Sequence, residues 1–219
     1  MIRPHIIIFA GPVGSGKSTN IRLLSVWLRQ RGIKTKETYL KTAFFITNVF
    51  SKFNRKVCSR YIFLINKITV ILDLIINAFF IFPILSLFKI KLWERLGYVV
   101  LVEEYLPGIL VDYFHLTLLY GLDKRIVRWL IKVLCSCLNL NRAIIIFLVC
   151  DYDVLPIRWR KRGSPREHVS YLMSQQKIFA IFSNSMNNAL SLSTNRDIND
   201  VFHELTLIIS RSITKRNSQ

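Results

Sequence analysis

The chain has 219 residues, which suits one domain with a substantial buried core. Hydrophobic residues make up 52%, and 31 Lys and Arg face 13 Asp and Glu, for a net charge of +18. This balance favours anionic partners such as nucleotides, nucleic acid or acidic lipid headgroups. The basic residues are scattered apart from a run near 158–166, so charge alone does not indicate a nucleic-acid-binding protein.

The cysteines and the N-terminus narrow the class further. The spacing of Cys58, Cys135, Cys137 and Cys150 is a poor zinc signature, and no histidine cluster completes it. We therefore expect reduced and mostly buried thiols. The apolar run 6–10 is too short for a secretory signal, so we expect a cytoplasmic protein.

Short apolar runs alternate with helical patterns along the chain. The first run, 5–10, is β-branched and nearly continuous, and a helical pattern over 17–31 follows it and stops at Gly32. Further strands are predicted at 35–40, 98–104, 142–151 and 189–193, and a last helix at about 199–213. The alternation predicts an α/β fold, a mostly parallel sheet with helices on both faces, in a single domain over 1–219.

The region 42–96 is a strongly apolar helical insertion between the second and third strands, and its part 68–88 passes a screen for a transmembrane helix. Two observations favour a helix that is buried or docked on the protein surface. A single crossing would place two strands of one sheet on opposite sides of a bilayer, and a polar stripe follows one helix face. A membrane-associated hairpin is the alternative, because basic residues flank the segment. The stripe is Asn66, Thr69, Asp73 and Asn77; the flanking residues are Lys67, Lys89 and Lys91.

The strongest signal is the stretch FAGPVGSGKST, which has the spacing of a phosphate-binding loop. Its glycines let successive backbone N–H groups point inward, and the next helix adds its positive N-terminus. Lys17 is expected to reach the β- and γ-phosphates of ATP, and the Ser18 hydroxyl to ligate Mg²⁺. The expected ATP-binding residues are Gly11, Pro12, Val13, Gly14, Ser15, Gly16, Lys17, Ser18 and Thr19.

Such a site needs a carboxylate near Mg²⁺, usually at the end of a neighbouring strand. Glu103 and Glu104 end the third predicted strand, and Asp151 and Asp153 follow the fourth. We favour Glu103 as the metal-side acid and keep Asp151 as the alternative. The non-functional interpretation is that these acids cap helices or are solvated loop residues.

A basic run, IRWRKRGSPREH, begins at Ile157. Arg158 and Arg162 share one helix face, and Gly163 breaks the helix. Residues 157–170 are therefore predicted to form a lid whose arginines neutralise charge on the transferred phosphoryl group. A solvated basic helix or a nucleic-acid patch is the alternative.

These motifs resemble the thymidylate kinase family of nucleoside monophosphate kinases, particularly its divergent archaeal-type members, over nearly the whole chain. GPVGSGKST is similar to the family's GxxGxGKST, LVEEY stands where Asp-Arg-Tyr or Asp-Arg-His is usual, and LVCDYDVLPIRWRKRGSPRE resembles the fourth strand and lid. The resemblance implies a P-loop NTPase three-layer sandwich with a five-stranded parallel sheet in the order 2-3-1-4-5, and Mg-ATP as donor. By it, Gly14, Gly16, Lys17, Ser18 and Thr19 bind phosphate, Glu103 is the metal-side acid, and Arg158 and Arg162 are lid arginines.

The departures from the family lie on the acceptor side. The Arg-Glu-Pro-Gly stretch usual after the second strand reads YLKTAFFI, the arginine after the third strand's acid is Glu104, and no arginine precedes Glu103 where the family keeps one. Lost arginine partners weaken the grip on an acceptor phosphate. Lys41, Arg60 or Lys89 could substitute.

The sequence thus predicts an ATP- and Mg²⁺-dependent phosphotransferase with Lys17, Arg158, Arg162 and Glu103 as catalytic residues and Ser18 with Glu103 at the metal. The expected acceptor is a nucleoside monophosphate, with dTMP among the candidates although the acceptor-binding arginines of the family are missing. The alternative is a P-loop ATPase or nucleotide-binding module on a membrane surface or nucleic acid. A homodimer is left open; membrane association through 42–96 and nucleic acid are not favoured.

Overall fold

A computed structural model describes residues 6–47, 59–137, 143–164, 166–186 and 188–217, without the side chains of 59–62, 137 and 212–217. Within them, five strands form one parallel sheet in the order β2-β3-β1-β4-β5. This confirms the predicted α/β fold, the parallel sheet and its strand order. The strands are β1 (Ile6–Ala10), β2 (Thr35–Leu40), β3 (Val99–Glu104), β4 (Ala143–Val149) and β5 (Ala189–Ser193).

The central strands are buried on both faces, as their continuous apolar sequences require. Every residue of β1 is buried, and β1 pairs with β3 on one side and with β4 on the other. The register opposes Phe9 to Glu103, so the end of β3 lies beside the end of β1. Consequently the chain that leaves β1 and the acids that end β3 meet at one edge of the sheet.

The fourth strand is shorter than predicted. It ends at Val149, which pairs with Ser193, the last residue of β5, and so the ladder has no partner beyond this point. Asp151 and Asp153 lie past the strand end and are exposed. The predicted strand start at His5 lies outside the described residues.

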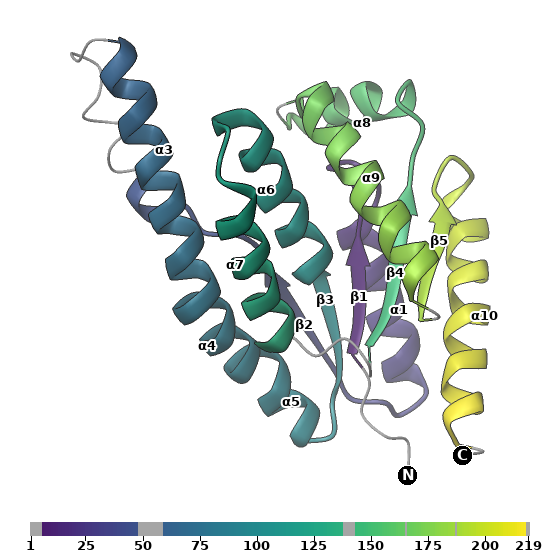
Figure 1. Cartoon of the computed structure of the whole chain (residues 1–219). Helices are drawn as coiled ribbons and strands as arrows, with labels where there is room; N and C mark the ends of the chain where they lie inside the picture. The colour runs from purple at the N-terminus through teal and green to yellow at the C-terminus, as the bar shows by residue number, and fades with distance from the viewer. Residues whose placement is uncertain (1–5, 48–58, 138–142, 165, 187, 218–219) are drawn as a thin grey trace.

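Helices cover both faces of the sheet (Figure 1). On one face pack α1 (Lys17–Gln30) and α10 (Ile198–Asn217), and on the other α6 (Tyr105–Tyr120), α7 (Lys124–Cys137) and α9 (Val169–Ser185). The short α8 (Val154–Arg162) contacts the loop between β1 and α1.

A long helical segment occupies most of the region 42–96 and runs along the outside of this second helical layer (Figure 1). We call it the outer helix; it comprises α3 (Ser59–Ile76), the π-helical turn η2 (Asn77–Ile81), α4 (Phe82–Ser86), a second π-helical turn η3 (Leu87–Lys91) and α5 (Leu92–Arg95). One side of it is buried in the core of that layer, through Val70, Leu74, Ala78, Phe82 and Ile90. Residues 48–58 of the insertion lie outside the described part of the chain.

The polar stripe of the outer helix faces the protein and holds the segment that follows β2. Asp73 is fully buried and accepts hydrogen bonds from the Ile46 N–H (3.0 Å), the Thr47 N–H (2.8 Å) and the Thr47 hydroxyl (2.7 Å). The Asn77 amide bonds both the N–H (3.0 Å) and the carbonyl (2.6 Å) of Ala43. The stripe therefore satisfies backbone groups of a connection without strand partners.

We expect Asp73→Ala to lower the free energy of unfolding by about 2 to 4 kcal/mol, because it removes a charged acceptor of several hydrogen bonds at a buried position. Urea unfolding followed by circular dichroism measures this. Asp200→Ala, which removes an exposed carboxylate on α10, is the control and should change stability by less than about 0.5 kcal/mol. Equal effects of the two changes would contradict the anchoring role of Asp73.

Candidate functional site

A glycine-rich loop, residues 11–16, joins β1 to α1 and ends at the helix N-terminus. Gly16 is the N-cap residue and has φ 90°, a left-handed conformation that favours glycine. It provides no side-chain cap, and the first turn of α1 contains no acidic residue. The positive end of the α1 dipole is therefore not neutralised from within the helix, and it favours an anion at this place.

Lys17 is the first residue of α1, and its ammonium group is directed back over the loop. It is 6% exposed and donates to the carbonyls of Gly11 (2.7 Å) and Pro12 (3.1 Å). Its third contact is an ion pair of 3.0 Å with the Glu104 carboxylate. These three acceptors match the three donors of an ammonium group, which explains how the charge is buried.

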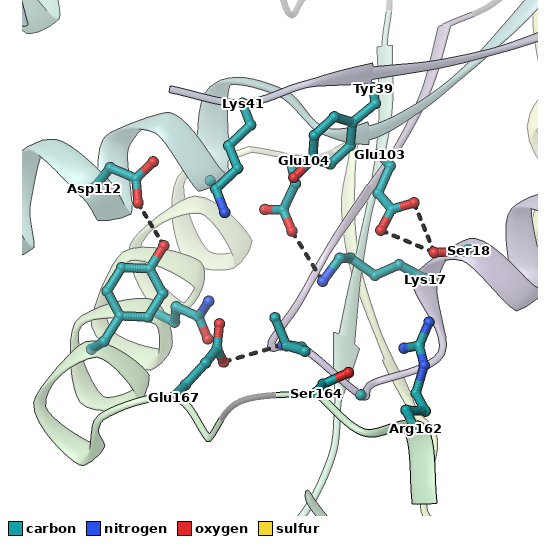
Figure 2. Close-up of a pocket in the computed structure, with 15 residues that line it drawn as sticks. Lys17, Ser18, Tyr39, Lys41, Glu103, Glu104, Asp112, Arg162, Ser164 and Glu167 are labelled. Carbon is teal, nitrogen blue, oxygen red and sulfur yellow. Dashed lines mark hydrogen bonds and ion pairs between the residues drawn. The ribbon is translucent and has the colours of Figure 1, made fainter. Parts of the chain in front are cut away.

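Ser18 and Glu103 meet beside this lysine (Figure 2). The Ser18 hydroxyl lies 2.9 and 3.1 Å from the two carboxylate oxygens of Glu103. The contact follows from the register of β1 and β3, which brings the end of β3 to the start of α1. A hydroxyl and a carboxylate at this distance are hard oxygen ligands that fit Mg²⁺, which usually takes one or two protein carboxylates together with phosphate oxygens.

Helix α8 is fastened to the loop through two side chains. The Trp159 indole N–H donates to the Val13 carbonyl (2.6 Å), and the Arg158 guanidinium donates to the Gly14 carbonyl (3.1 Å). Arg158 also reaches the Thr194 carbonyl (2.6 Å) after β5. The helix ends at Arg162, followed by Gly163 in a left-handed conformation.

Two cavities lie on either side of the glycine-rich loop and have opposite character. We call the first the basic cavity: it measures about 580 Å³ and is reached by four cationic side chains and one carboxylate. Its polar lining includes Thr19, Asn20, Thr194, Asp197, Arg158, Lys161, Arg162 and Arg196.

The second, which we call the acidic cavity, measures about 170 Å³ and is bounded by the ends of β2 and β3, by α6 and by the start of α9 (Figure 2). Its carboxylates are Glu103, Glu104, Asp112 and Glu167, and its cations are Lys17, Lys41 and Arg162. Ser18, Tyr39, Ser164, Tyr171 and Gln175 complete its polar lining.

Two of these carboxylates have a raised pKa. Burial raises the pKa of Asp112. Hydrogen bonds, such as the one that the Tyr171 hydroxyl donates at 2.6 Å, lower it in part. Burial likewise raises the pKa of Glu167, whose carboxylate accepts a hydrogen bond of 3.1 Å from the N–H of Val13 in the loop.

The structure brings together most of the residues that the sequence singled out. Lys17, Ser18 and Glu103 converge at one point, and Arg162 lines both cavities. Asp151, the alternative metal-side acid, lies on the surface and lines neither cavity. The lid residue Pro165 and the side chain of Arg60 lie outside the described residues.

Sequence reasoning missed the inner wall of the acidic cavity. Asp112 comes from the middle of α6, Tyr171 and Gln175 from α9, and Glu167 from the connection before it. A polar residue within an apolar helix was the available signal for Asp112, in the stretch YLPGILVDYFHLTLLY. Of the two cysteines whose side chains the structure describes, Cys150 is buried as expected and Cys135 is exposed. Cys58 and the side chain of Cys137 lie outside the described residues.

Comparison of the sequence with protein-family models and with curated proteins found no match. The assignment of function therefore depends on the geometry of the site.

The raised pKa of Asp112 predicts how its replacement changes stability with pH. A carboxyl whose folded pKa is raised destabilises the fold when it ionises, so its cost appears as pH rises above the unfolded value and is complete above the folded one. Asp112→Asn, which keeps an acceptor for Tyr171, should therefore stabilise the protein more at pH 7.5 than at pH 4. Urea unfolding of both proteins at the two pH values measures this, and a larger gain at pH 4 would contradict it.

Proposed function

We propose that the chain is an ATP- and Mg²⁺-dependent phosphotransferase of the thymidylate-kinase-like class, in which the glycine-rich loop is a P-loop. The observation that carries the proposal is the convergence of Lys17, Ser18 and Glu103 at the N-terminus of an uncapped helix. An ammonium group, a helix N-terminus and a hydroxyl–carboxylate pair are the parts that a triphosphate with its metal requires.

The basic cavity fits the remainder of the donor nucleotide. It begins at Gly14 and Gly16 of the loop and continues past Arg158 to Thr194 and Asp197, after β5. A nucleotide whose terminal phosphates lie on the loop would extend its base and ribose in this direction. The cationic lining supplies charge for the phosphates.

The proposed transfer depends on position and electrostatics. Ser18 and Glu103 would hold Mg²⁺, which when bound neutralises charge on the β- and γ-phosphates. Lys17 would exchange its bonds to the loop carbonyls for phosphate oxygens, and Arg162 would stabilise the transferred group, since it borders both cavities.

We expect Lys17→Ala to lower ATP turnover by about a hundredfold or more, the effect typical of removing one preorganised charge-stabilising donor. Release of ADP from Mg-ATP, measured with a coupled assay, is the readout. Lys177→Ala, an exposed change on α9, should leave turnover unaltered, and circular dichroism checks the fold of both. If Lys17→Ala turned over ATP as fast as the wild type, the proposed phosphotransferase function would be wrong.

A second candidate function is a nucleotide-binding module docked on an acidic membrane surface. Among the described residues, one helical stretch, Phe63–Arg95, is long and apolar enough to cross a membrane, with a mean hydropathy of 2.4 in its most apolar window. Since its inner side is packed on the core, the exposed side would lie on a membrane. That side exposes Phe63, Leu64, Ile68, Leu72, Phe79, Phe80, Ile84, Leu87, Phe88 and Leu92.

The neighbouring helix α7 extends this apolar surface and adds positive charge. The ring of Trp129 lies 5.3 Å from that of Phe79, centroid to centroid, and half of the Trp129 side chain is exposed. Apolar residues beside cations are the composition that binds anionic headgroups. The exposed basic residues of the two helices are Lys89, Lys91, Arg95, Lys124, Arg125, Arg128 and Lys132.

For this second function, we expect the full chain to sediment with vesicles of phosphatidylcholine and phosphatidylserine. Phe80→Asp with Phe88→Asp should reduce the bound fraction by about tenfold or more, because it places charge in the buried part of the contact. Val26→Asp, an exposed change on α1, is the control. Equal binding by all three proteins, or a chain that stays in the supernatant at moderate salt, would exclude this function.

A further inference from the structure

The backbone is strained where β3 ends in the acidic cavity. Glu104 has φ 77° and ψ −91°, and the next residue, Tyr105, has φ 63°. Side-chain-bearing residues adopt such conformations rarely and at an energetic cost, and they persist where surrounding contacts impose them. Strain of this kind clusters at functional sites.

The contacts that hold Glu104 direct its carboxylate into the cavity. One oxygen is paired with Lys17 at 3.0 Å. The other lies against Gly108 of α6, where an added Cβ would come within 2.4 Å of it. Tyr105, the residue that follows Glu104, is only 2% exposed and so anchors the chain in the core directly after the strained position. Glycine at position 108 thus leaves the room that the carboxylate occupies.

The charge of the cavity is unsuited to an acceptor that carries a phosphate. In the proposed transfer, Lys17 and Arg162 act on the donor phosphates and Glu103 acts at the metal. What remains around the acceptor is Glu104, Asp112 and Glu167, with Lys41 as their cation. A phosphate dianion placed there would be repelled by the Glu104 carboxylate and would make ionisation of the buried Asp112 and Glu167 carboxyls less favourable still, and no arginine remains to bind it.

One buried polar group in this cavity also has no partner. Gln175 is 5% exposed, and its side-chain oxygen makes no hydrogen bond with any described residue. It lines the cavity next to Tyr171 from the same helix. An unpaired buried acceptor is costly, so a ligand that donates an N–H or O–H there would be favoured.

We propose that the phosphoryl acceptor is a hydroxyl compound without a phosphate group, uncharged or cationic, such as a nucleoside, and that Glu104 accepts a hydrogen bond from its hydroxyl. This inference rests on the proposed function and specifies its acceptor; it replaces the nucleoside monophosphate that the family resemblance implies. The hydroxyl oxygen forms a bond to the γ-phosphorus, the bond from that phosphorus to the bridging oxygen breaks, and ADP leaves. The hydroxyl proton is released to water as the new bond forms. The Glu104 carboxylate, which Lys17 frees when it turns to the phosphates, positions the hydroxyl.

Ligand affinity tests the acceptor class directly. Nucleosides and their matched 5′-monophosphates are titrated by calorimetry into the full chain with Mg²⁺ and a non-hydrolysable ATP analogue. We expect the wild type to bind each monophosphate about tenfold or more weakly than its nucleoside, because of repulsion by the carboxylates. Tighter binding of the monophosphates would overturn the inference.

A charge reversal makes the test independent of which acceptor is used. Glu104→Arg should raise the affinity for the monophosphates by about tenfold or more, since it supplies a charge-assisted partner for the phosphate. Glu37→Arg makes the same charge change at an exposed position of β2 and should not. Glu104→Gln keeps the shape of the side chain and should weaken the rejection of monophosphates in part, which covers a failure of the arginine variant to fold.

Binding of the ATP analogue itself distinguishes a failure of the proposed function from a failure of the acceptor inference. If the wild type does not bind the analogue, the proposed function fails. If it binds the analogue but neither Glu104→Arg nor Glu104→Gln improves the affinity for monophosphates, the acceptor inference alone fails.

Discussion

The parallel pairing of β1 with β3 is the constraint on which the site depends. Its register opposes Phe9 to Glu103, and so the two acids that end β3 lie against the loop and helix that follow β1. Lys17 then finds a counter-charge in Glu104, and Ser18 finds a partner in Glu103. Both Lys17 and Ser18 lie in the first turn of α1, so the contacts follow from the pairing of the two strands and from the helix that begins directly after β1.

The glycine-rich loop divides the site into regions of opposite charge. The basic cavity on one side suits a polyanionic ligand, and the acidic cavity on the other side suits a ligand that carries no phosphate group. Arg162 reaches both cavities, and Arg158 fastens α8 to the loop between them; under the proposed function, the phosphoryl group would pass at this boundary. The strained backbone at Glu104 agrees with this division, because the strain lowers stability and holds a carboxylate in the acidic cavity.

Much of the fold could be predicted because continuous β-branched runs such as IIIFA and AIIIFLV have few alternatives to a buried parallel strand. The Ser18–Glu103 pair was predictable for the same reason, since strand ends gather at one edge. The wall formed by Asp112, Tyr171 and Gln175 was not, because single polar residues on α6 and α9 carry no spacing signal and meet only through packing. The polar stripe was visible, yet its role in holding 43–47 depended on a tertiary contact.

Calorimetric titration of ATP into the full chain, with Mg²⁺ and then with Mg²⁺ chelated, tests the central claim most directly. The loop, Lys17 and the Ser18–Glu103 pair predict saturable binding at one site that weakens by about tenfold or more when the metal is removed. Absence of saturable binding at millimolar Mg-ATP, or an affinity that neither Glu103→Gln nor removal of Mg²⁺ changes, would contradict the claim that this edge of the sheet holds a nucleoside triphosphate.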